Sequence, residues 1–137
     1  DSRTYNCTHF PVETLLACTW NPELVKEVGK AMGDEVKRYG IDVLLAPAIN
    51  IQRNPLNGRN FEYMGEDPLL ASAMVAEYVK GMQSTGTVAC LKHFICNETE
   101  FYRRRSNSIV DERALHELYL PPFKAGIDAG VGYVMTS

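Results

Sequence analysis

The sequence predicts an α/β fold made of parallel β/α repeats. Short runs of consecutive apolar residues alternate along the chain with longer segments in which apolar residues recur at helical spacing. Continuous apolarity is typical of parallel strands that are covered on both faces. The order predicts β-α-β-α-β-α-β with right-handed crossovers. Such a chain forms either an open doubly wound sheet or roughly half of a (β/α)8 barrel, which needs eight strands.

The four predicted strands are short apolar runs. Each is bounded by polar residues, glycine or proline, as expected for strands buried inside a sheet. They read LLAC, VLLAP, TVACL and YVM in chain order. The predicted strands therefore lie at residues 15–18, 43–47, 87–91 and 133–135.

Three helices are predicted between the strands from their start signals and apolar stripes. Asn21 offers an N-cap, Pro22 suits the first helical position, and Gly40 ends the apolar stripe. The pair Asp67-Pro68 repeats this start, and Asp111 caps a third helix. The predicted helices run over residues 22–39, 68–86 and 111–127.

Two prolines fall inside the third predicted helix. Pro121 and Pro122 each lack the backbone N–H that an interior helical residue donates. We therefore expect this helix to be kinked or divided near these residues.

The connection from residue 48 to residue 66, INIQRNPLNGRNFEYMGED, is much longer than an ordinary strand-to-helix loop. Such loops span about 2 to 6 residues, and much longer ones are usually functional or disordered. This one carries Arg53, Arg59, Glu62 and Glu66 among aromatic residues and glycines. That composition indicates an ordered binding loop.

Composition excludes several classes of function. The formal charge is −3, and the only run of consecutive basic residues, residues 103–105, lacks interleaved aromatic residues. No nucleic-acid partner is therefore expected. No apolar run is long enough to cross a membrane. The four cysteines and three histidines show no zinc-ligand spacing, and no glycine-rich phosphate loop follows a strand. We therefore expect no metal and no cofactor.

The segment CLKHFICNETE, residues 90–100, places two polar side chains inside an apolar run. Lys92 and His93 would be costly there unless a carboxylate, the backbone or a ligand satisfies them. Ligands of parallel α/β folds bind beyond the carboxyl ends of the strands, where the Arg59 loop also begins. The convergence favours a binding role for the pair over a purely structural one.

No complete catalytic device is visible in the residues. A serine or cysteine nucleophile would have to be chosen arbitrarily, without a nucleophile-elbow motif. A set of carboxylates could supply the pair that glycoside hydrolysis requires, or could simply hold nearby cations. We favour the second reading, with Glu62 or Glu66 near Arg59 and Glu100 near Lys92 or Arg103. The full set of carboxylates is Glu62, Glu66, Asp67, Glu98 and Glu100.

Several segments together resemble glycoside hydrolase family 3, the β-glucosidase and β-xylosidase group. They are GRNFEYMGEDP, KHFICNETE, VDERALHELYLPPF and VGYVMTS, preceded by FPVETLLACTWNPELVKEVG, in the family's order and spacing. The resemblance implies retaining hydrolysis of terminal β-linked sugars. It also implies that residues 1–137 form part of the family's (β/α)8-barrel domain, with about four β/α units.

The resemblance assigns roles to individual residues. Arg59, Lys92 and His93 match positions that hydrogen-bond the sugar hydroxyls of the −1 subsite, and Met135 matches a residue lining the same pocket. Asn97 and Glu100 match supporting positions beside the site, and we place Glu62 with them as a partner of Arg59. Family members often carry a non-proline cis peptide near the Lys-His pair, and we expect one here.

The family's nucleophile is an aspartate in a Ser-Asp-Trp-like motif, which this sequence lacks, since its only tryptophan is Trp20. No catalytic residue is therefore assigned within the chain, and the isolated chain is expected to be inactive. The expected partners are a β-linked glucoside or xyloside and the remainder of the barrel with its following domain, or another chain. The alternative is a non-catalytic half-barrel that binds carbohydrate or is purely structural.

Overall fold

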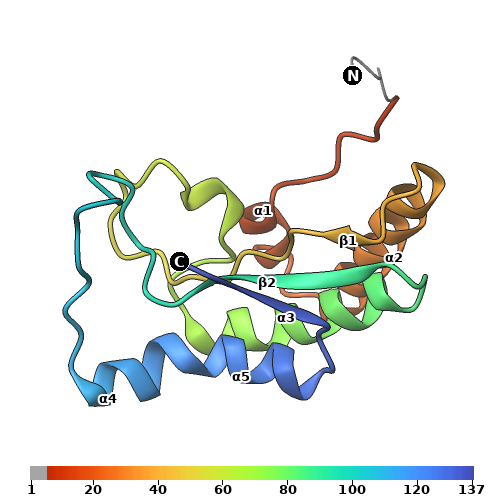
Figure 1. Ribbon diagram of the computed structural model, residues 1–137. Coiled ribbons are helices and arrows are strands. Elements are labelled where there is room, and N and C mark those ends of the chain that lie inside the picture. The colour runs from red at the N-terminus through yellow and green to blue at the C-terminus, as the bar shows by residue number, and fades with distance from the viewer. Residues whose placement is uncertain (1–5) are drawn as a thin grey trace.

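The structure, a computed structural model, describes residues 6–137 (Figure 1). Its sheet is parallel and consists of β1 (Val43–Leu44), β2 (Val88–Phe94) and β3 (Tyr133–Thr136), in that order. Val43 pairs with Val88 in the first ladder, and Cys90 pairs with Tyr133 in the second. The predicted α/β class with parallel β/α repeats is confirmed.

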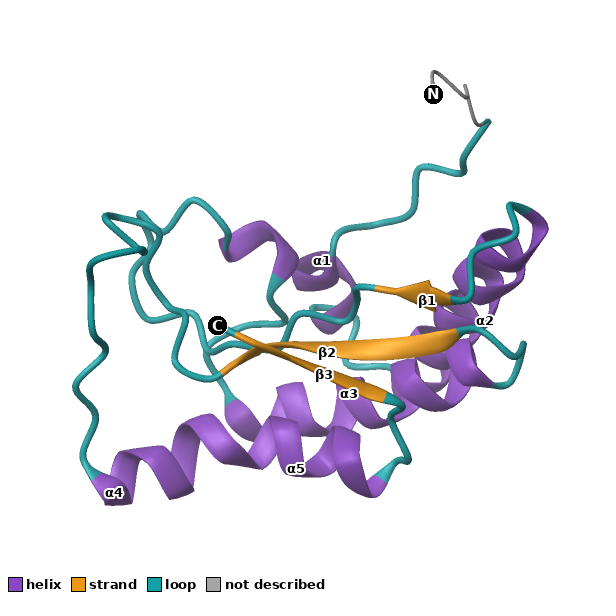
Figure 2. Ribbon diagram, in the orientation of Figure 1, coloured by secondary structure: helices purple, strands orange, loops and turns teal. Residues whose placement is uncertain are grey.

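Helices connect the strands (Figure 2). The regular ones are α1 (Glu13–Ala17), α2 (Pro22–Arg38), α3 (Pro68–Gln83), α4 (Glu112–Ala114) and α5 (Leu120–Asp128). A 3-10 turn, η1 (Asn60–Glu62), lies in the long connection after β1, and a π-helical turn, η2 (Leu115–Tyr119), joins α4 to α5. Three of the four predicted strands are present, at residues 43, 88 and 133.

The prediction of a strand at residues 15–18 is wrong, because this segment forms α1 and the turn that ends it. Leu16 and Ala17 are buried, so the apolar run does face the core, but from one helical turn. Glu13, at the start of α1, accepts two hydrogen bonds from the backbone N–H of Ala48, at 3.0 and 3.2 Å. An apolar run of four residues does not distinguish a strand from a buried helical turn.

The three predicted helix starts are confirmed by their caps. Asn21 accepts a hydrogen bond from the backbone N–H of Leu24 at 3.1 Å. Asp67 accepts from Leu69 at 2.7 Å, and Asp111 accepts from the N–H of Ala114 at 2.9 Å. Each cap satisfies a donor that the first helical turn leaves without an intrahelical partner.

The third helix is divided as expected. Its α-helical pattern changes to the π-helical turn η2 directly before Pro121 and Pro122, and α5 begins at Leu120. The two prolines thus fall in the first turn of α5, where a missing N–H costs little.

The helices pack closely along one face of the sheet, where α3 and α5 lie (Figure 1). Tyr78, Met82 and Leu91 are fully buried between these layers, together with Phe123. Helix α2 crosses α3 at glycines: a Cβ on Gly81 would lie 2.1 Å from the backbone oxygen of Lys26. This face therefore holds the main core, and the polar loops gather at the carboxyl ends of the strands.

Candidate functional site

The site is built by two loops at the carboxyl ends of β1 and β2. The connection of residues 48–66 follows β1, and residues 95–111 follow β2; the two run side by side (Figure 1). Lys92 and His93 stand near the end of β2, and Arg59 lies directly before η1. We call Arg59, Glu62, Lys92, His93, Asn97 and Glu100 the basic cluster.

Glu62 lies between the two cations of the basic cluster. One of its carboxylate oxygens contacts the Nε of Arg59, and the other lies 3.1 Å from the Nζ of Lys92. All three side chains are largely removed from solvent, with 23%, 17% and 16% of the side chains of Arg59, Glu62 and Lys92 exposed. The sequence-based prediction of Glu62 as a partner of Arg59 is confirmed.

A second carboxylate binds Arg59 from the other loop. Glu100 Oε1 lies 3.5 Å from Arg59 Nη1 and accepts a hydrogen bond from Asn97 Nδ2 at 3.2 Å. Its other oxygen lies 3.1 Å from Arg103. Glu100 therefore pairs with Arg103, as expected, and with Arg59 rather than Lys92.

These charges perturb one another. Burial opposes ionisation of Glu62, but the hydrogen bonds and charges of Arg59 and Lys92 outweigh it and lower the pKa of Glu62. Burial likewise opposes the charge of Arg59, but Glu62 and Glu100 raise its pKa. At neutral pH, Glu62 is thus an anion and Arg59 a cation.

His93 is buried and is held by Asn50. The backbone N–H of His93 donates to Asn50 Oδ1 at 2.7 Å, and Asn50 Nδ2 donates to the carbonyl of His93 at 2.9 Å. His93 Nδ1 lies 3.3 Å from the same Oδ1. Since Oδ1 is an acceptor, this contact favours the tautomer with the proton on Nδ1, which leaves Nε2 as an acceptor.

Burial and the charges of Arg59 and Lys92 lower the pKa of His93 to about 4. The imidazole is therefore neutral at neutral pH. The peptide bond between Lys92 and His93 is cis, as is the bond between Phe94 and Ile95. The expected non-proline cis peptide at the Lys-His pair is thus present.

Tyr63 connects the two loops behind the basic cluster. Its hydroxyl donates to the backbone carbonyl of Asn97 at 3.1 Å, and its ring meets that of His93 edge to face. Burial raises the pKa of Tyr63 to about 12, so the hydroxyl stays protonated and can donate. Tyr63 and Asn50 were both missed by sequence reasoning. The available signal was their position, polar groups in the long connection directly after a buried strand.

Met135 lies on β3 beside the basic cluster. It is half-buried and stands between Val134 and Thr136, which pair with Leu91 and Phe94 of β2. This register places Met135 next to Lys92 and His93, so the structure brings all seven residues that sequence reasoning assigned to the site to the same end of the sheet.

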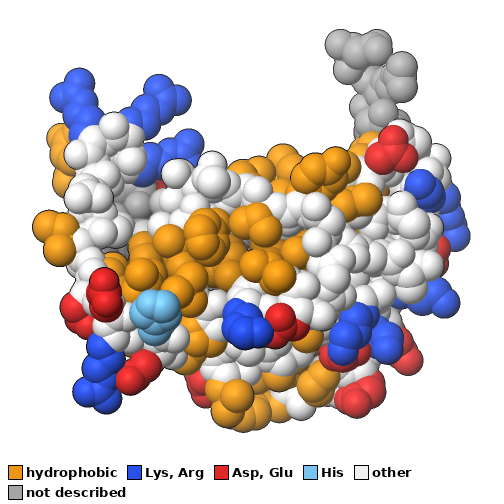
Figure 3. Space-filling model, turned by 60° about the horizontal axis from the view of Figure 1, so that its bottom comes forward, with side chains coloured by type: hydrophobic (Ala, Val, Ile, Leu, Met, Phe, Trp, Pro, Cys, Tyr) orange, Lys and Arg blue, Asp and Glu red, His pale blue; other side chains and the backbone are white. Residues whose placement is uncertain are grey.

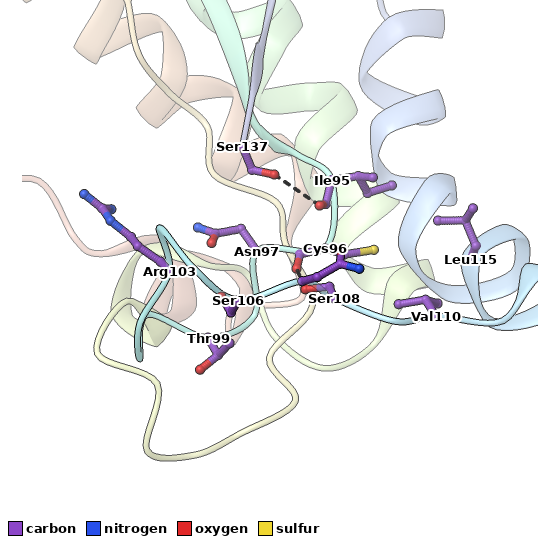
Figure 4. A pocket seen from close by; sticks show the side chains of 11 residues that line it. Ile95, Cys96, Asn97, Thr99, Arg103, Ser106, Ser108, Val110, Leu115 and Ser137 are labelled. Carbon is purple, nitrogen blue, oxygen red and sulfur yellow. Dashed lines mark hydrogen bonds between the residues drawn. The ribbon is translucent and has the colours of Figure 1, made fainter.

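Arg59, His93 and Asn97 line a surface hollow of about 290 Å³, and its other lining residues are Arg103, Arg104, Thr136 and Ser137. A larger hollow of about 400 Å³ adjoins it and shares Asn97, Arg103 and Ser137 (Figure 4). Two hydrogen bonds fix the second hollow: Ser108 donates to the carbonyl of Cys96 at 2.8 Å, and Ser137 donates to that of Ile95 at 3.2 Å.

The first hollow presents several donors, among them three guanidinium groups, together with neutral acceptors. Arg59 and Asn97 can donate, and the neutral imidazole of His93 can accept through Nε2. Hydroxyl groups, which both donate and accept, match this set. In the part of the chain that the structure describes, no three histidine, cysteine or carboxylate side chains converge as metal ligands would. No helix among residues 6–137 is long and apolar enough to span a bilayer.

Comparisons with known proteins all match this chain to the same family of glycosidases. All 137 residues match the family model described as the glycosyl hydrolase family 3 N terminal domain. The chain is 50% identical over 125 residues to β-glucosidase BoGH3A of Bacteroides ovatus, covering 91% of this chain and 17% of that protein. It is 48% identical over 120 residues to thermostable β-glucosidase B of Acetivibrio thermocellus, covering 88% of this chain and 16% of that protein.

Solved structures agree. β-Glucosidase 3B from Thermotoga neapolitana, in complex with α-D-glucose, superimposes with a TM-score of 0.94 at 55% identity. That match covers 99% of this chain and 19% of the solved one. DesR, a β-glucosidase from Streptomyces venezuelae in complex with D-glucose, gives a TM-score of 0.96 at 34% identity, covering 97% and 17% of the two chains. The chain thus spans less than a fifth of the length of these relatives. With the family model matched over its whole length, this chain belongs to glycosyl hydrolase family 3 and corresponds to part of that family's N terminal domain.

Proposed function

We propose that this chain forms the sugar-binding wall of a retaining β-glucosidase. Arg59, Lys92 and His93 hydrogen-bond the hydroxyls of a terminal β-linked glucose or xylose, and Met135 lines the same pocket. Glu62, Asn97 and Glu100 hold these side chains in position. The observation that carries the proposal is the hollow at the carboxyl end of β2, where Arg59, His93 and Asn97 meet.

The reacting carboxylates come from outside this chain. Retaining hydrolysis needs two carboxyl groups about 5 Å apart across the glycosidic bond, one of them free to attack carbon. The two carboxylates of the basic cluster are each bound to two cations, Glu62 to Arg59 and Lys92, and Glu100 to Arg59 and Arg103. This engagement supports a positioning role for both and leaves the basic cluster without a nucleophile.

The remainder of the barrel covers the apolar surface of this chain. Hydrophobic side chains gather in a patch on one face of the molecule (Figure 3). A hollow of about 410 Å³ between the end of β2 and α5 is lined by Phe94, Leu120, Phe123 and Ile127. Exposed apolar surface of this kind is typical of an interface, which supports a larger assembly around residues 6–137.

The test is hydrolysis of p-nitrophenyl β-glucoside and β-xyloside by this chain and by the full-length protein that contains it. We expect activity only in the full-length protein, and we expect Arg59→Met and Lys92→Met to reduce it strongly. Lys30→Met, which removes an exposed lysine of α2, is the matched control. Hydrolysis by residues 1–137 alone would contradict the proposal and would identify Glu98 or Glu100 as the nucleophile.

A further inference from the structure

A second polar hollow lies beside the basic cluster and holds an unsatisfied carboxylate. It has a volume of about 350 Å³ and is bounded by the loop after β1 and the loop after β2. Glu98 lines it and is only 5% exposed, and although Asn50 lies nearby, no hydrogen bond of normal geometry reaches either of its carboxylate oxygens. A buried carboxylate without donors is costly, so a donor supplied by a ligand would stabilise it.

Arg53 lines the same hollow without closing on Glu98. Its guanidinium lies over the ring of Tyr119, 5.8 Å from the ring centre. Among the described residues no carboxylate lies within ion-pair distance of Arg53. The hollow therefore holds a carboxylate and a guanidinium that are not paired with each other, and a bound molecule could contact both.

Apart from Ile109, the rest of the lining is polar and uncharged. Asn54 and Asn107 contribute amide groups, and Thr99, Ser106 and Ser108 contribute hydroxyls. Neighbouring hydroxyls of a sugar can donate to both oxygens of one carboxylate while accepting from amide or guanidinium groups. A cationic ligand would satisfy Glu98 too, but the charge of Arg53 in the same hollow disfavours it.

We infer that this hollow is a second carbohydrate-binding subsite, in which Glu98 accepts from two hydroxyls of a sugar unit and Arg53 donates to another of its oxygens. The inference rests on the proposed function only in that the ligand is a saccharide. The subsite is separate from the basic cluster, because none of the residues that line this hollow belongs to that cluster.

Burial supports this assignment by changing the ionisation of the carboxylate. It raises the pKa of Glu98 to about 7, against the lowering effects of Arg53 and of Asn50. Near neutral pH the group is then partly protonated, and it can donate to a sugar oxygen as well as accept.

The test measures glucose binding by ligand-observed saturation-transfer NMR on the full-length protein. The first site is silenced by the pair of changes Arg59→Met and Lys92→Met. We expect weaker but saturable glucose binding in this background, and about a tenfold further loss of affinity on adding Glu98→Gln or Arg53→Met. Glu112→Gln, which removes an exposed carboxylate at the start of α4, is the matched control and should change nothing.

The inference would be overturned if the residual glucose binding were unchanged by Glu98→Gln. It would also be overturned if the silenced protein bound a cation, arginine methyl ester, through Glu98 and did not bind glucose. If the silenced protein does not fold, Glu98→Gln in the unsilenced protein should convert a two-site glucose titration to a one-site titration. A one-site curve before the substitution would equally overturn the inference. The proposed function would be contradicted by a different result: unchanged hydrolysis of p-nitrophenyl β-glucoside by the Arg59→Met variant of the full-length protein.

Discussion

The ammonium group of Lys92 lies 3.1 Å from Oε2 of Glu62, whose other carboxylate oxygen contacts Arg59. One carboxylate thus fixes two cations that come from different elements, β2 and the loop before η1. Two unneutralised cations this close would repel each other in a partly buried site. The geometry of both cations therefore depends on Glu62.

Replacing Glu62 should misplace both cations. We expect Glu62→Gln to lower kcat/KM of the full-length protein for p-nitrophenyl β-glucoside about tenfold or more, because an amide keeps the shape but not the charge. Glu66→Gln, in the same connection and exposed, is the matched control. Thermal melting distinguishes a positioning role from a role in folding. If Glu62→Gln lowers the melting temperature along with kcat/KM, and Glu62→Asp restores none of the lost kcat/KM, Glu62 is a purely structural residue.

Asn50 should be the most costly polar residue to truncate. Its side chain accepts a hydrogen bond from the backbone N–H of His93 and donates one to the carbonyl of His93, and Asn50 is only 3% exposed. Asn50→Ala leaves both backbone groups without partners, so we expect a loss of about 2–4 kcal/mol in the free energy of unfolding. Urea denaturation measures this, with Asn107→Ala, an exposed loop amide, as the comparison. Equal costs for the two variants would show that Asn50 is dispensable.

Much of the fold could be predicted because its signals are local. The caps at Asn21, Asp67 and Asp111 lie within three residues of the donors they satisfy, and the sequence shows them directly. The segment 15–18 could not be assigned correctly, because its burial comes from distant contacts such as that of Glu13 with Ala48. A pattern of four apolar residues contains no information on that contact.

The candidate site was predicted in part for the same reason. Lys92 and His93 stood out as polar residues inside an apolar run, and Arg59 stood out in a long connection. The role of Asn50 depends on how the chain after β1 runs along the chain after β2, which no local pattern encodes. Glu98 was grouped with carboxylates that hold cations, yet no ion pair joins it to Arg53, whose guanidinium lies over the ring of Tyr119.

The crossing of α2 and α3 should not tolerate a side chain at Gly81. A Cβ there would lie 2.1 Å from the backbone oxygen of Lys26, and backbone atoms of a packed helix cannot move aside cheaply. We expect Gly81→Ala to cost about 2–4 kcal/mol despite the higher helix propensity of alanine. Gly58→Ala, where a Cβ meets nothing within 4 Å, is the control. Denaturation midpoints that are equal for the two variants would contradict the close approach of the helices.

Two buried groups near the site should give the stability a pH dependence with opposite signs. His93 has a pKa of about 4 in the folded chain against an ordinary value of 6.5. Between these values the unfolded chain binds a proton that the folded chain does not, so stability falls as the pH drops through that window. Glu98 has a pKa of about 7 against an ordinary value of 4.5. Here the folded chain holds the extra proton, so stability falls as the pH rises from 4.5 to 7.

The two effects overlap between pH 4.5 and 6.5 and largely cancel there, so each must be isolated by substitution. Since one pKa unit corresponds to about 1.4 kcal/mol, each group contributes on the order of 3 kcal/mol across its window. We expect stability to rise more steeply from pH 4 to 6.5 in Glu98→Gln than in the unsubstituted protein, because the shifted pKa of His93 is then no longer opposed by that of Glu98. His93→Gln should leave the opposite slope. Urea denaturation at half-unit pH steps measures both, and parallel curves for Glu98→Gln and the unsubstituted protein would show that Glu98 is solvated and ionises normally.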